Sequence, residues 1–365
     1  MGADLRAERR GALGALLEHE GLDGLIVTSL PNVRYLTGFS GTAGVALVLR
    51  DGVSFFTDFR YRSQADDEVG DAARIEIVST DVWSRVWEVV RAAPALDTVG
   101  FEAHAVTVYQ AGRFADAKLP CRLQPANELV ERLRVRKHPT EVAAIRRAAA
   151  LAGEALRATL ESVRVGEREL DVAARLESEL RRRGSEWHPF PTIVASGPRS
   201  ALPHARTSPR AIGPGDLLLL DFGAELDGYC ADLTRTVVVG RRADERQRVV
   251  YDLVREAQLT ARTGIRAGMT GRDADALARS PIEARGFGDA FGHSLGHGLG
   301  LEVHEGPRVS KGNANPLPAG AVVTIEPGVY IPGWGGVRIE DDVHLAADGP
   351  ELLSDGVTDL IELAD

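Results

Sequence analysis

The chain has 365 residues with 53 acidic and 43 basic side chains, a formal net charge of −10, and a length that favours two domains. The acidic balance argues against nucleic acid as a partner, because phosphate binding needs a basic face, and no apolar run approaches the ~20 residues that cross a bilayer. The two cysteines, Cys121 and Cys230, provide neither a disulfide framework nor a cysteine-ligated metal site.

The N-terminal part of the chain has the pattern of an α/β domain. The first ten residues are charged and lack the apolar core of a signal peptide, which favours a cytoplasmic protein. The pattern then predicts helices at residues 4–19 and 63–69 and strands at residues 24–28 and 75–78. It also predicts a turn at residues 31–32 and a hairpin over residues 45–57. The hairpin is indicated by Asp51-Gly52, which is a typical turn dipeptide between two apolar strands.

A domain boundary is predicted between residues 126 and 138. A charged amphipathic stretch there is followed by Pro139, which suits the first turn of a helix, and by Glu141, which complements the helix dipole. An alanine-rich helix over residues 140–162 follows. We therefore predict one domain over residues 1–128, a linker over 129–138 and a second domain over 139–365.

The second half of the chain alternates apolar strands with helices. The strands are predicted at residues 217–220, 237–239, 321–325 and 337–340, and the helices at 244–263 and 271–285. Pro281 interrupts the second helical pattern, and a proline inside a helix costs ~3 kcal/mol unless it begins one. We therefore expect that helix to restart at Pro281.

Four carboxylates follow or lie near these strands: Asp221, Asp232, Glu326 and Glu340. Each alone has a structural interpretation, as a cap at a strand end or turn, or as part of a solvated acidic run. Together they indicate a shared site, since two like charges 4 Å apart repel by ~4 kcal/mol at an effective dielectric of 20. Two divalent cations would neutralise such a cluster.

Three histidines, His293, His297 and His304, fall within twelve residues that are rich in glycine. The glycines disfavour a regular helix and indicate a backbone packed close to a ligand or to another strand. A lone histidine is more often structural than functional, but three beside four candidate carboxylates favour a site. His204, in the segment Ala201–Ala205, carries a weaker signal.

The segments that contain these residues resemble known motifs. Residues 221–236, 291–305, 324–328 and 336–341 resemble the motifs of the pita-bread dinuclear metallopeptidases, in the branch of the Xaa-Pro peptidases, prolidase and aminopeptidase P. The resemblance is strong over residues 140–365 and looser over 32–39 and 57–61. It implies an α+β fold, with a pita-bread (creatinase/aminopeptidase-like) C-terminal domain and a smaller α/β creatinase-type N-terminal domain.

The resemblance also implies the roles of individual residues. It places the five metal ligands on Asp221, Asp232, His297, Glu326 and Glu340. Four carboxylates and one imidazole favour two manganese ions, with cobalt or zinc as alternatives. Glu326 would also act as the base.

Four further residues are expected on the substrate side of that site, three histidines by the resemblance and Arg338 by its position two residues before Glu340. His293 and His304 would contact the substrate and stabilise the oxyanion or protonate the leaving nitrogen, and His204 matches the substrate-side histidine. Arg338 would orient Glu340 or meet a substrate carboxylate. An ion pair of Arg338 with Asp341 or Asp232 is the structural alternative.

The activity implied by the resemblance is hydrolysis of the peptide bond that precedes proline, by a homodimer acting on small peptides with proline second. We favour a dipeptidase (prolidase), and an aminopeptidase P that acts on longer peptides stays open. Methionine aminopeptidases lack the extra N-terminal domain, and creatinase-like hydrolases lack the full ligand set. A catalytically inactive pita-bread binding module is the more distant alternative, and such modules generally lose ligands.

Overall fold

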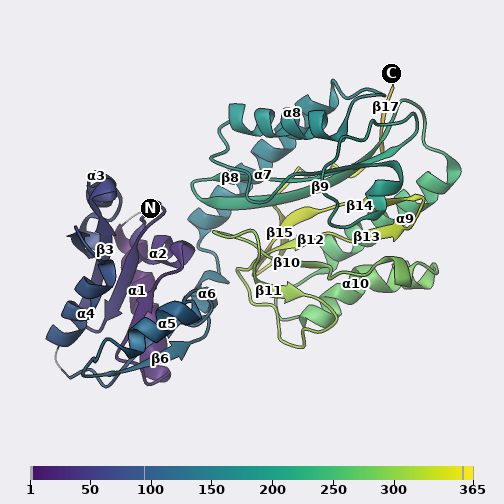
Figure 1. Cartoon of the computed structure of the whole chain (residues 1–365). Coiled ribbons are helices and arrows are strands. Elements are labelled where there is room, and N and C mark those ends of the chain that lie inside the picture. The colour runs from purple at the N-terminus through teal and green to yellow at the C-terminus, as the bar shows by residue number, and fades with distance from the viewer. Residues whose placement is uncertain (1–2, 94, 356, 365) are drawn as a thin grey trace. The chain divides into compact units, whose positions relative to one another are not determined.

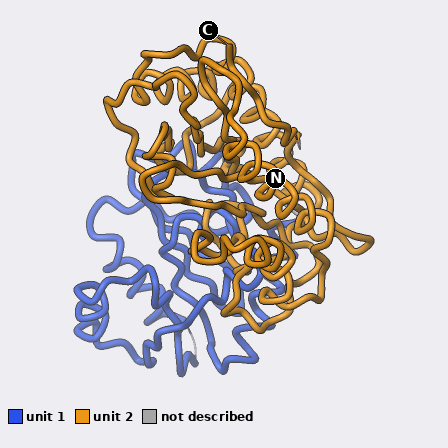
Figure 2. Tube along the Cα trace, turned by 90° about the vertical axis from the view of Figure 1, so that its right-hand side faces the viewer, with its two compact units in different colours: residues 1–134 blue, residues 135–365 orange. Residues whose placement is uncertain are grey.

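The structure is a computed structural model that describes residues 3–93, 95–355 and 357–364. The chain divides into two compact units, residues 1–134 and 135–365, which are coloured separately in Figure 2. The segment 129–138, predicted as a linker, contains helix α6 (Leu129–Arg134) of the first unit. Among the described residues, none of the helices has both the length and the apolarity that a membrane span requires.

The described residues of the first unit form a six-stranded sheet with flanking helices (Figure 1). The sheet order is β4-β3-β2-β1-β5-β6. Strand β2 is antiparallel to both β1 and β3. Strand β4 is parallel to β3, β5 is parallel to β1, and β6 is parallel to β5. The strands are β1 (Gly24–Val27), β2 (Val45–Leu49), β3 (Gly52–Asp58), β4 (Arg74–Val78), β5 (Thr98–Glu102) and β6 (Arg122–Ala126). The other helices are α1 (Ala3–His19), α2 (Leu30–Thr37), α3 (Arg62–Glu68), α4 (Val82–Ala92) and α5 (Val108–Ala115).

The helices and strands that the sequence predicts in this unit all form, and one predicted turn is wrong. The predicted hairpin forms, with Leu49 paired to Gly52 across the turn. The predicted turn at Pro31-Asn32 is wrong, because these residues lie in the first turn of α2. A proline is compatible with that position, since the N–H that it lacks has no partner inside the helix there. Pro31 therefore marks a helix start rather than a turn.

The second unit is layered. Helices α7 and α8 cover one face of the sheet β17-β9-β8-β7, whereas α9 and α10 pack against the sheet β11-β10-β12-β15-β16 and the ribbon β13-β14 (Figure 1). The helices are α7 (Pro139–Leu160), α8 (Glu169–Arg182), α9 (Glu245–Gly264) and α10 (Gly271–Ala284). The strands are β7 (Ile193–Ser196), β8 (Leu217–Leu226), β9 (Tyr229–Val239), β10 (Gly296–Gly298), β11 (Glu305–Val309), β12 (Val322–Ile325), β13 (Gly328–Ile331), β14 (Gly335–Arg338), β15 (Asp341–Ala346), β16 (Gly349–Leu352) and β17 (Ile361–Leu363).

Helix α7 begins as the sequence predicts. His138 is the N-cap residue, and its side chain accepts a hydrogen bond from the backbone N–H of Thr140. The Glu141 carboxylate in turn accepts from the backbone N–H of His138 at 2.8 Å. Pro139 occupies the first turn. The buried alanines of α7 then pack on β8 and β9 in one continuous apolar cluster, which covers the outer face of this sheet.

Strands β8 and β9 are longer than the apolar runs that predict them. Asp221 and Asp232 therefore lie within strands rather than at strand ends, and Asp221 pairs with Thr234 while Asp232 pairs with Gly223. The reason is the alternation of side chains along a strand. Phe222 belongs to the core under α7 and α8, so its neighbour Asp221 points to the opposite face of the sheet.

Helix α10 continues through Pro281, so the predicted restart at this residue is wrong. Proline removes one helical hydrogen bond. Ala278 and Ile282, on either side of it, are fully buried in the core of the second unit, and their packing offsets that loss. Tertiary burial decides this helix, not local propensity.

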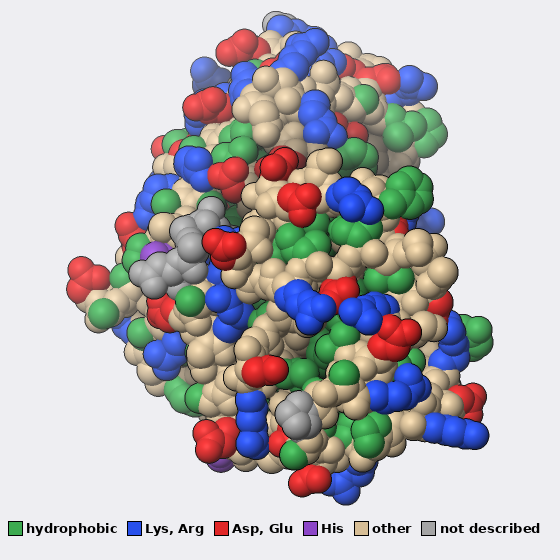
Figure 3. All heavy atoms as spheres, turned by 90° about the vertical axis from the view of Figure 1, so that its left-hand side faces the viewer, with side chains coloured by type: hydrophobic (Ala, Val, Ile, Leu, Met, Phe, Trp, Pro, Cys, Tyr) green, Lys and Arg blue, Asp and Glu red, His purple; other side chains and the backbone are tan. Residues whose placement is uncertain are grey.

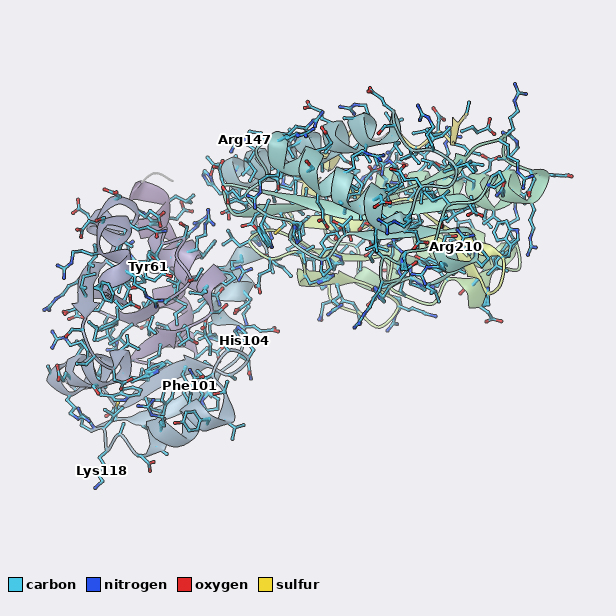
Figure 4. The ribbon with its side chains drawn as sticks, turned by 45° about the horizontal axis from the view of Figure 1, so that its top comes forward. Tyr61, Phe101, His104, Lys118, Arg147 and Arg210 are labelled. Carbon is cyan, nitrogen blue, oxygen red and sulfur yellow. The ribbon has the colours of Figure 1, made fainter. Side chains whose placement is uncertain are left out.

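Acidic and basic side chains are interspersed with apolar ones on the face of the molecule that Figure 3 shows. Exposed ion pairs are part of this pattern in both units, as with Arg147, labelled in Figure 4, which pairs with Asp227. Pairs of this kind contribute little to stability, because water screens them.

Candidate metal centre

The five predicted ligands, Asp221, Asp232, His297, Glu326 and Glu340, line one cavity of about 880 Å³ in the second unit. Asp221 comes from β8, Asp232 from β9 and His297 from β10, whereas Glu326 follows β12 and Glu340 precedes β15. His297 Nε2 lies 3.7 Å from Asp232 Oδ2 and 3.5 Å from Glu326 Oε1. Single ligand atoms of Asp232, His297 and Glu340 lie within 4.8 Å of one another, a spacing that suits a shared cation.

The ring of His297 is oriented by its own backbone. Its Nδ1 lies 3.1 Å from the carbonyl oxygen of Gly298. Because a carbonyl only accepts, Nδ1 carries the hydrogen and Nε2 presents a lone pair to the carboxylates. This is the tautomer that a metal-binding histidine needs.

The glycines beside His297 allow strands to approach closely, as the sequence predicts. A Cβ on Gly296 would overlap the carbonyl of Thr324 on β12, and a Cβ on Gly298 would overlap the carbonyl of Gly306 on β11. His297 itself donates its backbone N–H to Thr324 Oγ1 at 3.1 Å. The histidine is therefore held between two neighbouring strands.

Burial and mutual repulsion make the four carboxylates costly to ionise together. Burial raises the pKa of Asp232 and of Glu326 well above the ordinary range, and the neighbouring carboxylates add to the effect. Burial, followed by repulsion from Asp221, raises the pKa of Glu340 to about 8. The pKa of Asp221 is also raised by burial, although Arg338 opposes this.

The same burial lowers the pKa of His297 to about 4, so that its ring is neutral at pH 7. Asp232 Oδ1 is buried and has no hydrogen-bond partner among the described residues. A buried oxygen of this kind is costly unless something else satisfies it. Oxygen-rich donors, one neutral imidazole and an unsatisfied carboxylate oxygen together fit divalent cations.

A group of hydrogen bonds supports the ligands from behind. Thr234 Oγ1 donates to Glu340 Oε2 at 2.6 Å. Arg338 forms an ion pair with Asp221, and its Nε donates to Thr234 Oγ1 at 3.0 Å. Its Nη1 donates to the hydroxyl of Tyr330 at 2.8 Å. These contacts couple two ligands from distant segments, Asp221 and Glu340, to one guanidinium.

The partner of Arg338 differs from those that the sequence suggested. Its ion pair is with Asp221, and the alternatives Asp341 and Asp232 are not its partners. Asp341 instead pairs with Arg235 at 2.7 Å and with Arg262 at 2.9 Å. Arg338 is 3% exposed and lines the cavity, so its contacts support a role in holding Asp221 more than one in binding a substrate carboxylate.

The histidines predicted on the substrate side, His204, His293 and His304, line the same cavity. His293 Nδ1 lies 2.8 Å from the Ser294 carbonyl oxygen and its Nε2 lies 2.9 Å from the Tyr330 hydroxyl. Nδ1 therefore carries the hydrogen, and Nε2 accepts from Tyr330. Burial lowers the pKa of His293 to about 4, and burial together with Arg308 lowers the pKa of His304.

The structure adds residues in or next to the cavity that the sequence did not single out. Tyr330 contacts both His293 and Arg338, and Arg206 and Arg308 line the cavity with exposed side chains. Tyr330 lies four residues after Glu326 in the chain, and Arg308 lies four residues after His304. A single sequence gives no signal that separates them from ordinary strand residues, because their roles depend on segments far away in the chain.

A second group of possible ligand atoms, Glu102, His104 and Glu131, lies in the first unit, where Figure 4 labels His104. Glu102 already accepts from the backbone N–H groups of Thr28 at 2.6 Å and Ser29 at 2.7 Å. It therefore satisfies two backbone N–H groups just before α2, and His104 lies 3.1 Å from Glu131. This group has a structural explanation.

Comparison with known proteins places both units. Residues 143–347 match the model of metallopeptidase family M24, and residues 9–136 match the creatinase/prolidase N-terminal domain. The chain is 34% identical to the Xaa-Pro dipeptidase of Pyrococcus furiosus over 349 residues, which covers 95% of this chain and 97% of that protein.

Solved structures show the same architecture. The Xaa-Pro dipeptidase from Bacillus anthracis is 38% identical, with a TM-score of 0.94 and coverage of 98% of this chain and 100% of that chain. The X-Pro aminopeptidase from Thermotoga maritima is 35% identical, with a TM-score of 0.88 and coverage of 94% and 98%.

Proposed function

This chain belongs to metallopeptidase family M24, and we propose that it is a metal-dependent Xaa-Pro dipeptidase, which hydrolyses the bond before a C-terminal proline. The fold is the expected pita-bread domain with a creatinase-type N-terminal domain. The observation that carries the proposal is the convergence of four carboxylates and one neutral imidazole in a single cavity.

Asp221, Asp232, His297, Glu326 and Glu340 would hold two divalent cations, and the oxygen-rich donor set supports manganese over cobalt or zinc. When bound, such a pair lowers the pKa of a water molecule towards neutrality and polarises a carbonyl oxygen. Glu326 is our candidate for the base, since it lines the cavity with its Oε1 3.5 Å from His297 Nε2.

The residues on the substrate side would manage a proton and the developing negative charge. The Tyr330 hydroxyl donates to His293 Nε2 at 2.9 Å, and its hydrogen is the one that this pair would pass to the leaving nitrogen. His304, whose ring centre lies 4.4 Å from that of His297, would stabilise an oxyanion from the cavity side. His204 faces the same cavity from the segment after β7.

The wall of the cavity supports proline as the second residue. Phe190, Pro191 and Ile193 provide apolar surface. Proline has a fixed φ near −65° and no N–H, so it loses nothing in a site that offers no amide acceptor. An alanine there would bury an unpaired N–H at ~1–3 kcal/mol, which is about 5- to 150-fold in rate if it is felt in the transition state.

A dipeptidase also needs a cation for the substrate carboxylate. Arg206 and Arg308 line the cavity, and Arg338 is engaged with Asp221. The X-Pro aminopeptidase from Thermotoga maritima is similar at 35% identity, which keeps an aminopeptidase acting on longer peptides as the second candidate. We also propose that the protein forms a homodimer, which light scattering would test. We further propose that it is cytoplasmic.

Steady-state kinetics on Ala-Pro, Ala-Ala and Ala-Pro-Ala would test the proposal in the presence of manganese. We expect kcat/KM to be highest for Ala-Pro. Comparable values for Ala-Ala would exclude a proline pocket, and faster cleavage of Ala-Pro-Ala would favour the aminopeptidase. Metal analysis before and after chelation would expose an inactive binding module, which would hold no metal and cleave none of the three.

A further inference from the structure

Helix α10 carries a buried ion pair that does not line the cavity. Arg279 Nε lies 2.6 Å from Asp275 Oδ2, and its Nη2 lies 2.9 Å from Asp275 Oδ1, so the pair is bidentate. The two side chains are 6% and 2% exposed. Burying two charges costs several kcal/mol, which the attraction alone does not reliably repay. The other contacts of the pair show what it can do.

Those contacts all reach one loop, which connects α10 to β10. Arg279 Nη1 donates to the carbonyl of Phe291 at 2.8 Å, and Nη2 donates to the carbonyl of His293 at 2.7 Å. Asp275 Oδ1 accepts the backbone N–H of Leu295 at 3.1 Å. The pair therefore fixes the backbone at Phe291, His293 and Leu295.

The pair also reaches the ring of His293. The guanidinium of Arg279 lies 4.0 Å from the ring centre of Phe291, and that ring meets the His293 ring edge to face at 5.1 Å. At the end of this loop, the Leu295 carbonyl accepts the backbone N–H of Glu326 at 2.9 Å. The same segment thus connects α10 with a proposed base.

We propose that Asp275 and Arg279 are a positioning pair, which sets the location and ring orientation of His293 in the cavity without touching the substrate. The proposal rests on the function proposed above, since it assigns His293 a part in the reaction. Arginine suits this task because its planar fork can bind a carboxylate with two N–H groups and still donate to carbonyls. Lysine offers one point charge in its place.

A double-mutant cycle tests the pair. Arg279→Gln and Asp275→Asn are each introduced into the native chain and into His293→Ala, and Ala-Pro hydrolysis is measured with manganese. In the native background we expect kcat to fall ~10- to 100-fold with KM nearly unchanged, as for a misplaced group. In the His293→Ala background we expect a further loss of no more than about twofold, since the effect acts through His293.

Controls separate positioning from general damage. Arg279→Lys should recover only part of kcat. Arg175→Gln removes a partly buried arginine–carboxylate pair between α8 and Glu167, neither of which lines the cavity, and should leave kcat unchanged. Two metals per chain and a single cooperative unfolding transition would show that each variant is folded, and Asp275→Asn serves if Arg279→Gln does not fold.

A readout without substrate makes the two proposals separable. In zinc-loaded protein with ¹⁵N-labelled histidine, the His293 ring should show one Nδ1–H tautomer, and Arg279→Gln should convert it to an averaged signal. A native enzyme without Xaa-Pro activity would refute the proposed function while this measurement still tests the pair. An unchanged tautomer, equal losses of kcat in both backgrounds, or a parallel loss of metal would overturn the positioning role.

Discussion

Thr234 and Glu340 are 106 residues apart in the chain, yet the hydroxyl of Thr234 donates a hydrogen bond of 2.6 Å to Glu340 Oε2. The bond connects the centre of β9 to the segment between β14 and β15. The bond restricts the orientation of the Glu340 carboxylate, and Oε1 remains outside this bond. A contact of this kind, behind a ligand, tunes the affinity of a metal site.

We therefore expect Thr234→Val to weaken metal binding by about 10- to 100-fold. Valine keeps the volume and the strand propensity but removes the hydroxyl, which also accepts from Arg338. Competition with a chelator of known affinity measures the change. Thr234→Ser is the matched control, because it keeps the donor. Native affinity in Thr234→Val would mean that this bond does not support the ligand.

The stability of the metal-free protein should depend on pH in a defined direction. The pKa of Glu340 is raised to about 8 in the folded protein, above its ordinary value of 4.5. A raised folded pKa gives stability that is full below the unfolded value and is lost as pH rises through the folded one. Asp232 and Glu326 shift in the same direction.

The unfolding temperature of the chelator-treated protein should thus fall between about pH 5 and pH 8.5. Added manganese should restore it most at the alkaline end, where the carboxylates are ionised. Glu340→Gln should flatten the decline, because it removes one titrating group. A metal-free protein that becomes more stable over this range would contradict the buried, uncompensated cluster.

The histidines should divide into two classes. We expect His297→Ala to lose metal, since its Nε2 faces two carboxylates. His293→Ala and His304→Ala should keep the metal and lose ~10²-fold or more in kcat, as for removal of a transition-state donor. Elemental analysis beside kinetics checks both parts, and equal metal loss in all three variants would refute the division.

Recognition of the substrate carboxylate should depend on an arginine of the cavity wall. We expect Arg206→Gln or Arg308→Gln to raise KM for Ala-Pro, with a much smaller effect on the amide Ala-Pro-NH₂, which lacks the charge. The cost of losing a charge-assisted bond is ~1.5–3 kcal/mol, or roughly 10- to 150-fold. Identical effects on both substrates in both variants would show that neither guanidinium reads the carboxylate.

Two glycines of the histidine segment should respond differently to alanine. Gly296→Ala places a Cβ against the Thr324 carbonyl, so we expect a loss of ~1–3 kcal/mol or more in unfolding free energy. Gly292→Ala meets no atom within 4 Å and should be nearly neutral. Denaturant titration compares them, and equal stability of both variants would contradict the close approach of β10 and β12.

Local sequence signals determined much of this protein, because they act over a few residues. Asp51-Gly52 specifies the hairpin of β2 and β3, and Pro139 with Glu141 marks the start of α7. The ligand candidates are also readable, since carboxylates and histidines are rarely placed beside apolar strands without a reason. Motif resemblance then supplied the family and the chemistry to expect.

Only the tertiary structure decided how these pieces meet. Asp221 lies within β8 because the alternating pattern continues past the leucine run, and Pro281 stays in α10 because the core buries its neighbours. The partner of Arg338 and the contact of Tyr330 with His293 join segments that no local pattern relates. Charge and hydrogen-bond complementarity act through space, so such pairings follow from the packing of distant strands and not from spacing along the chain.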